Sequence, residues 1–223
     1  MVALPFRDRL EAGRLLGAEL ASRMAGGDAI VVALPRGGLP VAAEVARALS
    51  APLDIVVVRK LGVPWQPELA MGAMTHSVRI LDHQLIRDLR IPDEEVQAAI
   101  ERETQELLRR EELYRSGLPP QDFRDKTVIL VDDGLATGST MLAAARHVRS
   151  ARPKRVVIAV PVGPPDTCRR FKREADECSC LAQPEPFLAV GEWYADFPQV
   201  SDSEVREILA RVAHPGRSLA HRD

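Results

Sequence analysis

The sequence predicts an α/β fold in which a mostly parallel sheet is flanked by helices. Short apolar runs rich in β-branched residues recur along the chain, and segments with helical periodicity separate them. These runs lack polar alternation, so we expect strands that are covered on both faces. The chain has 223 residues, which is long enough to bury the core of one large domain. We therefore expect a single domain over residues 1–223.

The first half of the chain should begin with an amphipathic helix and continue with alternating strands and helices. Gly26 and Gly27 end the helical pattern, and Pro35 with the glycines after it ends the first apolar run. The apolar face of the first helix would comprise Phe6, Leu10, Leu16, Leu20 and Met24. The predicted elements are a helix at 6–24, a strand at 29–34, a helix at 40–49, a strand at 54–58, a loop at 61–67 and an edge strand at 78–81.

A long, highly charged helix is predicted at residues 93–116. A narrow apolar stripe runs along it, while charges of both signs are mixed over the rest of its surface. The mixed charges are typical of a solvated face and argue against RNA binding. The stripe would pack on the core or on a second copy of the chain, and the second arrangement would form a homo-oligomer. The stripe consists of Val96, Ile100, Leu107 and Tyr114.

The second half of the chain repeats the alternation. Asp166 could cap a short helix, and Ser201 with Glu204 has the spacing of a capping box that opens a helix. The inward residues of that helix would be Val205, Ile208, Leu209 and Val212. The predicted elements are strands at 127–131, 155–160 and 187–190, and helices at 139–150 and from 201 onward.

Composition excludes several classes of protein. The chain is 46% hydrophobic with a formal net charge of −2, which argues against a disordered chain and against non-specific nucleic-acid binding. No apolar run approaches the ~20 residues of a membrane span. Charge comes too early at the N-terminus for a signal peptide, so we expect a cytoplasmic protein. The three cysteines are an odd number, which favours free thiols, and their spacing does not suggest a zinc site.

Residues 128–140 combine an apolar strand, two acids and a loop of small and hydroxyl residues. The strand would deliver Asp132 and Asp133 to the carboxyl edge of the sheet, where ligands bind in open parallel sheets. Gly138 allows close backbone approach, and the helix after it would present N–H groups to a phosphate. Because carboxylates accept hydrogen bonds from a diol, the segment suits a sugar phosphate. The hydroxyl groups belong to Thr137, Ser139 and Thr140.

Two other interpretations of this segment compete with sugar-phosphate binding. An apolar strand followed by two aspartates resembles a Walker B strand of a phosphohydrolase. The chain contains no G-x-x-x-x-G-K-[ST] loop, however, and no G-x-G-x-x-G follows a strand, so nucleotide folds of those kinds are unsupported. Asp133 could instead satisfy the backbone of a turn.

Residues 128–140 resemble the phosphoribosyl pyrophosphate motif of the type I phosphoribosyltransferases, and further segments agree in order. Residues 34–38 are similar to the family's pyrophosphate loop, and Arg59 with Lys60 to the basic pair of the orotate enzymes. Residues 61–74 would match the family's mobile catalytic loop. The whole chain also resembles small bacterial members of the family. The resemblance implies a core at about 27–160, a helical insertion at about 92–118 and a small C-terminal hood at about 181–200.

The resemblance implies Mg²⁺-dependent transfer of ribose 5-phosphate from phosphoribosyl pyrophosphate to a nitrogen nucleophile such as a nucleobase, with release of pyrophosphate. Asp132 and Asp133 would hold the ribose hydroxyls and Mg²⁺, directly or through water. Arg59 and Lys60 would act as catalytic cations with them, although they could also be the solvated end of a strand. The 5-phosphate would bind at Ala136, Thr137, Gly138, Ser139 and Thr140, and pyrophosphate at Arg36, Gly37, Gly38 and Arg59.

The sequence does not assign the acceptor base. Ala136 stands where hypoxanthine-guanine enzymes carry an Asp, so this position is more like adenine or orotate enzymes. Residues 187–197 loosely resemble the base-binding segment of 6-oxopurine enzymes, which points to a different base. Four of the nine aromatic residues lie in this segment, where they could stack on a base or pack in the core. These acceptor candidates are Phe187, Trp193, Tyr194 and Phe197.

The sequence therefore predicts an enzyme whose partners are phosphoribosyl pyrophosphate and a small acceptor, with no nucleic acid and no membrane. The alternative is a non-catalytic sensor of the same fold. Such a sensor would bind the sugar donor or a nucleotide and control a protein or RNA partner. The net charge of −2 disfavours RNA in that role but not a protein.

Overall fold

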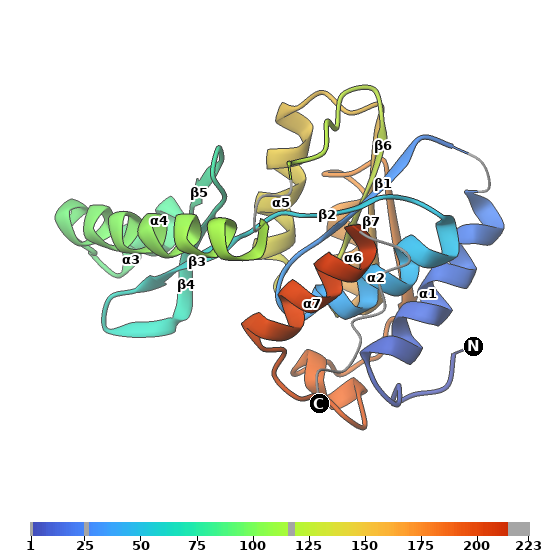
Figure 1. Cartoon of the computed structure of the whole chain (residues 1–223). Helices are drawn as coiled ribbons and strands as arrows, with labels where there is room; N and C mark the ends of the chain where they lie inside the picture. The colour runs from blue at the N-terminus through green and yellow to red at the C-terminus, as the bar shows by residue number, and fades with distance from the viewer. Residues whose placement is uncertain (1, 25–26, 116–118, 214–223) are drawn as a thin grey trace, which may run out of the picture.

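A computed structural model describes residues 2–24, 27–115 and 119–213 of the chain. A five-stranded parallel sheet forms its centre, with the strand order β2-β1-β6-β7-β8, and helices cover both faces (Figure 1). The strands of this sheet are β1 (Ala29–Ala33), β2 (Leu53–Ile55), β6 (Thr127–Val131), β7 (Arg155–Val162) and β8 (Glu177–Ala182). The predicted fold class, a mostly parallel sheet between helices, is confirmed.

Alternate residues of the central strands supply two separate apolar clusters. Val31 and Ala33 of β1 point to one face, with helices α1 (Arg9–Arg23), α2 (Gly38–Leu49) and α7 (Asp202–Ala213). Ile30 and Val32 point to the other face, with α5 (Ser139–Ser150) and α6 (Pro165–Phe171). Alternate residues of a strand point to opposite faces of the sheet. Because these strands are apolar at nearly every position, they are buried on both faces, as the sequence predicts.

The remaining elements form a lobe at one side of the central sheet (Figure 1). A second, antiparallel sheet has the order β3-β4-β5, and two helices lie beside it. The lobe comprises β3 (Arg59–Val63), β4 (Gln66–Met74), β5 (Arg79–Leu81), α3 (His83–Asp88) and α4 (Asp93–Arg115). The charged helix predicted at 93–116 is thus confirmed as α4, and its apolar stripe is buried within the chain.

The loop predicted at residues 61–67 is wrong, while the match of residues 61–74 to a mobile catalytic loop stays a prediction. These residues form the β3–β4 hairpin, with Pro64 and Trp65 in the turn. Leu61, Val63 and Met71 of the hairpin are buried in the core cluster, which accounts for the apolar residues of the segment. The register shifts at Gly62 interrupt the regular alternation, so the sequence pattern contains little strand signal.

The strand predicted at residues 187–190 is also wrong. The last strand of the sheet is β8, and residues 190–193 form the short 3₁₀ helix η1 (Val190–Trp193). Phe187 and Val190 pack in a third apolar cluster with Phe6 and Tyr194, so their apolar character serves this cluster and not the sheet. Strand β8 lies at the sheet edge and is mostly half-buried, which accounts for its mixed composition.

The N-terminal helix is shorter than predicted, and one residue of its predicted apolar face, Leu10, is exposed. Helix α1 begins at Arg9, after Asp8 caps its N-terminus by accepting a hydrogen bond from the Glu11 N–H. Phe6 precedes the helix and packs against Tyr194, and Leu10 is largely exposed. Both were predicted on the buried face, and Phe6 is buried although it lies outside the helix. The buried residues of the helix are Arg9, Ala12, Gly13, Leu16, Gly17 and Leu20.

The later helices follow the sequence pattern more closely. The capping box that opens α7 is confirmed, because the Ser201 N–H donates to Glu204 and the Glu204 N–H donates to the Ser201 hydroxyl. Asp166 lies in the first turn of α6 and pairs with Arg169, so the predicted cap is wrong; Pro164 is the N-cap residue. The strand β2 is also shorter than the predicted 54–58.

All three cysteines are free thiols. Within residues 2–24, 27–115 and 119–213, no cluster of His, Cys, Asp and Glu side chains could hold a metal by itself. No helix in the same part of the chain has the length and apolar content needed to span a membrane.

The junction between the lobe and the central sheet depends on the buried carboxylate of Asp54 in β2. It accepts hydrogen bonds from Arg115 Nη1 at 2.9 Å, the Gln121 N–H at 2.8 Å and the Ile55 N–H at 2.7 Å. Asp54→Ala leaves the Arg115 guanidinium half-buried without this partner, so we expect the free energy of unfolding to fall by about 3 kcal/mol. Urea denaturation measures it. The exposed Asp122→Ala is the control, and an equal loss in both variants would contradict this role.

Candidate functional site

Loops that follow β1 and β6 meet at the carboxyl edge of the central sheet, and glycines let them touch. A Cβ atom on Gly37 would lie 2.1 Å from Asp133 Oδ2, and one on Gly38 would lie 2.8 Å from the Asp132 Cα. The loop after β1 also contains a cis peptide bond between Pro35 and Arg36. The structure therefore brings the two predicted motifs, residues 36–38 and the aspartate pair, into direct contact.

The carboxyl groups of Asp132 and Asp133 form one partly buried, interacting pair. Burial raises the pKa of Asp132 well above its ordinary value, and the neighbouring Asp133 charge raises it further. Burial also raises the pKa of Asp133, although the Arg9 guanidinium opposes this. The Asp133 N–H donates to Asp132 Oδ1 at 2.9 Å. A cation or a hydroxyl donor that approaches the pair would stabilise its negative charge.

Arg9 holds the Asp133 carboxylate in place from the first turn of α1. Its Nε donates to Asp133 Oδ2 at 2.9 Å and its Nη1 to the Pro198 carbonyl at 2.7 Å, while the guanidinium lies 3.7 Å from the centre of the Phe197 ring. Arg9 is buried. Sequence reasoning missed it, because a charged residue at a helix start 124 positions from its partner gives no local signal.

Tyr194 supports the same aspartate from the C-terminal segment. Its hydroxyl donates to the Asp133 carbonyl at 2.6 Å, and burial raises the pKa of this phenol. The ring is buried and lies 4.9 Å from that of Phe197, measured between centroids. Phe187 and Trp193 stack on each other at 6.0 Å. Of the acceptor-base candidates, Tyr194 and Phe197 are therefore engaged in holding Asp133 and Arg9.

The predicted phosphate loop leads into helix α5. Gly138 is its N-cap residue and has a φ of 76°, a left-handed conformation that favours glycine. A Cβ atom there would lie 2.5 Å from Phe171 Cε2, so only glycine fits against this ring. From the same helix α6, Thr167 Oγ1 donates to the Ala136 carbonyl at 3.0 Å, and Arg170 Nη2 donates to the Thr137 carbonyl. Sequence reasoning did not connect α6 with this loop.

The predicted pyrophosphate-binding cations have acidic partners. Arg36 Nη1 lies 3.6 Å from Asp202 Oδ1 at the start of α7. Arg59 Nη2 lies 2.6 Å from Glu103 Oε2 of α4, so this ion pair lies within the lobe and not at the aspartate pair. Lys60 is exposed in β3. The structure thus brings Arg36 to the edge where the aspartates lie, and it pairs Arg59 with α4 instead.

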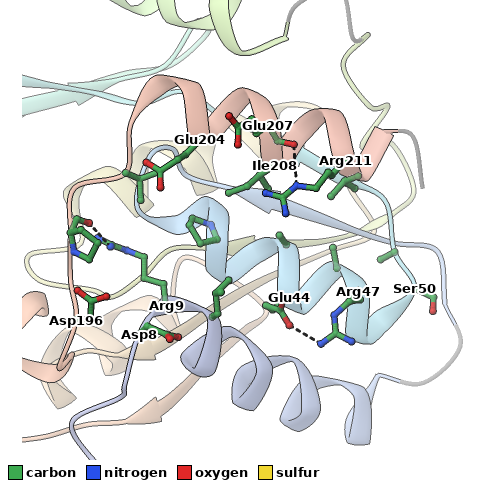
Figure 2. Close-up of a pocket in the computed structure, with 18 residues that line it drawn as sticks. Asp8, Arg9, Glu44, Arg47, Ser50, Asp196, Glu204, Glu207, Ile208 and Arg211 are labelled. Carbon is green, nitrogen blue, oxygen red and sulfur yellow. Dashed lines mark hydrogen bonds and ion pairs between the residues drawn. The ribbon is translucent and has the colours of Figure 1, made fainter. Parts of the chain in front are cut away.

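A large cavity lies beside this site and not on the aspartate pair. It has a volume of about 1020 Å³ and runs between α1, α2 and α7 (Figure 2). Its lining includes Pro40, Ala46 and Ile208, together with carboxylates such as Glu204. Arg9 forms part of the wall, so its side chain separates the cavity from Asp133.

We expect Arg9→Ala to destabilise the chain, because it leaves the partly buried Asp133 carboxylate without its cation. The loss should be about 3 kcal/mol in the free energy of unfolding at neutral pH. The control is Arg7→Ala, which removes an exposed arginine that pairs with the adjacent Asp8. Urea denaturation at pH 7 compares the two variants, and equal stability of Arg9→Ala and the parent chain would contradict the role of Arg9.

We expect Asp132→Asn to stabilise the ligand-free protein at neutral pH. A carboxyl group whose pKa is raised by folding favours the unfolded state increasingly as the pH rises above its ordinary value of about 3.9. Asparagine removes this penalty and keeps the Oδ1 acceptor for the Asp133 N–H. The gain in Tm should therefore be largest near pH 8 and vanish near pH 4. Thermal unfolding across this range tests it; a lower Tm at pH 8 would contradict it.

Comparisons with known proteins agree with this architecture. The family model described as the phosphoribosyl transferase domain matches residues 10–191. Two strain versions of a Mycobacterium tuberculosis protein, a phosphoribosyl transferase by name, are 45% identical over 98% of this chain and 47% of their own length. The chain therefore spans about half the length of these curated relatives. The crystal structure of TT1426 from Thermus thermophilus has a TM-score of 0.77 at 41% identity, covering 92% of this chain and 98% of that one.

The family model covers well over half of the chain, and it includes both the glycine loop after β1 and the aspartate pair after β6. The relatives are similar over almost the whole chain at high identity. By these similarities, and by the parallel sheet whose carboxyl edge carries both motifs, the chain belongs to the phosphoribosyl transferase domain family.

Proposed function

We propose that this protein transfers ribose 5-phosphate from phosphoribosyl pyrophosphate to a nitrogen nucleophile and releases pyrophosphate. The observation that carries the proposal is the contact between the loop at residues 36–38 and the Asp132–Asp133 pair, at the sheet edge where the phosphate loop begins. One edge thus offers two anion-binding loops with a pair of carboxylates between them. A ribose with phosphate groups at both ends has the complementary arrangement.

Different residues would bind different parts of the sugar donor. Asp132 and Asp133 would accept hydrogen bonds from the ribose hydroxyls, with Asp133 held by Arg9 and Tyr194. Residues 136–140 would bind the 5-phosphate through backbone N–H groups at the start of α5. The backbone of Gly37 and Gly38 would receive pyrophosphate, and Arg36 would supply positive charge once it exchanges Asp202 for phosphate oxygens.

A magnesium ion suits the donor set of this site. Burial raises the pKa of both carboxyl groups, the Asp133 charge raises that of Asp132 further, and a cation would stabilise both groups in the ionised form. Because the described side chains provide no complete metal site, the ion would be held with substrate phosphates and water, as Mg²⁺ usually is. When bound, it would neutralise negative charge on the leaving pyrophosphate.

Catalysis would then come from placement and charge. As the bond from ribose to pyrophosphate breaks, the ribose carbon gains positive character and the leaving group gains negative charge. The protein's part is to fix the ribose between its two anion sites, to hold both carboxyl groups beside the hydroxyls, and to meet the leaving group with N–H donors and Arg36. Arg59 and Lys60 would act as catalytic cations only if the β3–β4 hairpin brings them to the pyrophosphate.

The acceptor is a nucleobase in this proposal, and its identity stays open. Ala136 can neither donate nor accept a proton by its side chain. Its carbonyl is occupied by the Thr167 hydroxyl, so any proton acceptor for the base must come from another residue. Phe187 and Trp193, which stack on each other, remain the aromatic candidates for contact with a base. The free thiols are in keeping with a cytoplasmic location.

The test is release of pyrophosphate from phosphoribosyl pyrophosphate with Mg²⁺ across a panel of nucleobases and simple amines. We expect turnover with at least one acceptor, and loss of at least about a hundredfold in kcat/KM for Asp132→Asn and Asp133→Asn. Chelation of Mg²⁺ should abolish turnover. The matched control is Asp122→Asn, an exposed aspartate. Donor binding without turnover for any acceptor would overturn the enzyme and favour the sensor of the same fold.

A further inference from the structure

Helix α6 packs directly against the loop that leads into α5. The helix contacts successive residues of the loop. Thr167 donates to the Ala136 carbonyl, Arg170 donates to the Thr137 carbonyl, and the Phe171 ring packs against Gly138. Phe171 is fully buried, so this end of α6 is anchored in the core. A side chain fixed here is therefore fixed relative to the loop.

The guanidinium of Arg170 lies over the entrance to α5. Its Nη2 is 3.1 Å from the position that a Cβ atom on Gly138 would occupy, and its Cζ is 5.6 Å from the centre of the Phe171 ring. The side chain is exposed, so a ligand can reach it. Arginine carries five N–H donors, and the contact with the Thr137 carbonyl uses only part of them.

The loop itself has no cation to offer a phosphate. Residues 134–145 contain neither lysine nor arginine, so the only positive charge that this segment provides is the partial charge of the helix N-terminus. A phosphate monoester carries close to two negative charges at neutral pH. A guanidinium held by a neighbouring helix, and lying at the same N-terminus, supplies the charge that the loop lacks.

We propose that Arg170 is a binding residue for the 5-phosphate of the sugar donor, and that Thr167 positions the loop for it. The inference rests on the proposed function, because that function places a 5-phosphate at residues 136–140. The guanidinium stays on the Thr137 carbonyl and donates its remaining N–H groups to phosphate oxygens. Pyrophosphate, which would bind at the loop after β1, is not contacted by Arg170.

The chain offers a matched control in the same helical turn. Arg169 is also exposed and carries the same charge, but it pairs with Asp166 and not with the loop. Arg170→Ala and Arg169→Ala therefore remove the same net charge from the same helix end. Arg170→Lys keeps the charge but not the planar group that can contact the carbonyl and a phosphate together.

The experiment measures dissociation constants of the full chain for ribose 5-phosphate, phosphoribosyl pyrophosphate and pyrophosphate alone by calorimetry. We expect Arg170→Ala to weaken binding of the first two about tenfold or more, because a hydrogen bond to a charged group is lost. Arg170→Lys should lie between Ala and the parent chain. Pyrophosphate binding should be unchanged in every variant, and Arg169→Ala should resemble the parent throughout. Thermal unfolding checks that each variant is folded.

Each outcome bears on Arg170 separately from the proposed activity. An equal loss of ribose 5-phosphate binding in Arg169→Ala and Arg170→Ala would show that the effect comes from net charge alone. This result would overturn the assignment of Arg170. Unchanged ribose 5-phosphate binding in Arg170→Ala would also overturn the assignment. The same holds if the parent chain does not bind ribose 5-phosphate. If ribose 5-phosphate binds and depends on Arg170 while no acceptor gives turnover, the assignment stands and the proposed transfer fails.

Discussion

The ion pair between Arg9 and Asp133 is the contact on which the arrangement of the site depends. It joins the first turn of α1 to the loop after β6, and the same guanidinium binds the Pro198 carbonyl and covers the Phe197 ring. Two distant parts of the chain are thus tied to one carboxylate. A buried carboxylate needs such a partner, because its desolvation is otherwise uncompensated. The N-terminal helix and the C-terminal segment owe their positions beside the central sheet in part to this requirement.

The same carboxylate pair costs stability in the ligand-free chain, and the proposed function gives it a use. Burial raises the pKa values of Asp132 and Asp133, so the ionised pair is unfavourable in the folded, ligand-free chain. Arg9 offsets this for Asp133 more than for Asp132, because it donates directly to the Asp133 carboxylate. Glycines bring a second loop within contact distance of this pair, and in the proposed function a ligand would supply the compensating groups.

Cations around the site are held by carboxylates of other elements. Arg36 faces Asp202 of α7, whose carboxylate also accepts a hydrogen bond from Tyr114 of α4. Arg59 faces Glu103 of the same helix. The lobe thus reaches the sheet edge through polar contacts, and an anionic ligand would compete with Asp202 for Arg36. Arg170 differs from both, because its contact beside the loop is a neutral carbonyl and not a carboxylate.

The sequence by itself determined the parallel sheet, the long charged helix and the two loops at the sheet edge, because local apolar periodicity and glycine positions encode them. It did not reveal the β3–β4 hairpin, where register shifts at Gly62 break the alternation, or β8, whose edge position leaves it weakly apolar. Only the tertiary structure decided which distant side chains complete the site. Arg9, Tyr194 and Arg170 contact residues far away in the chain. Tyr194 was an acceptor-base candidate in the sequence, but no local pattern marks its contact with Asp133 or the contacts of the two arginines.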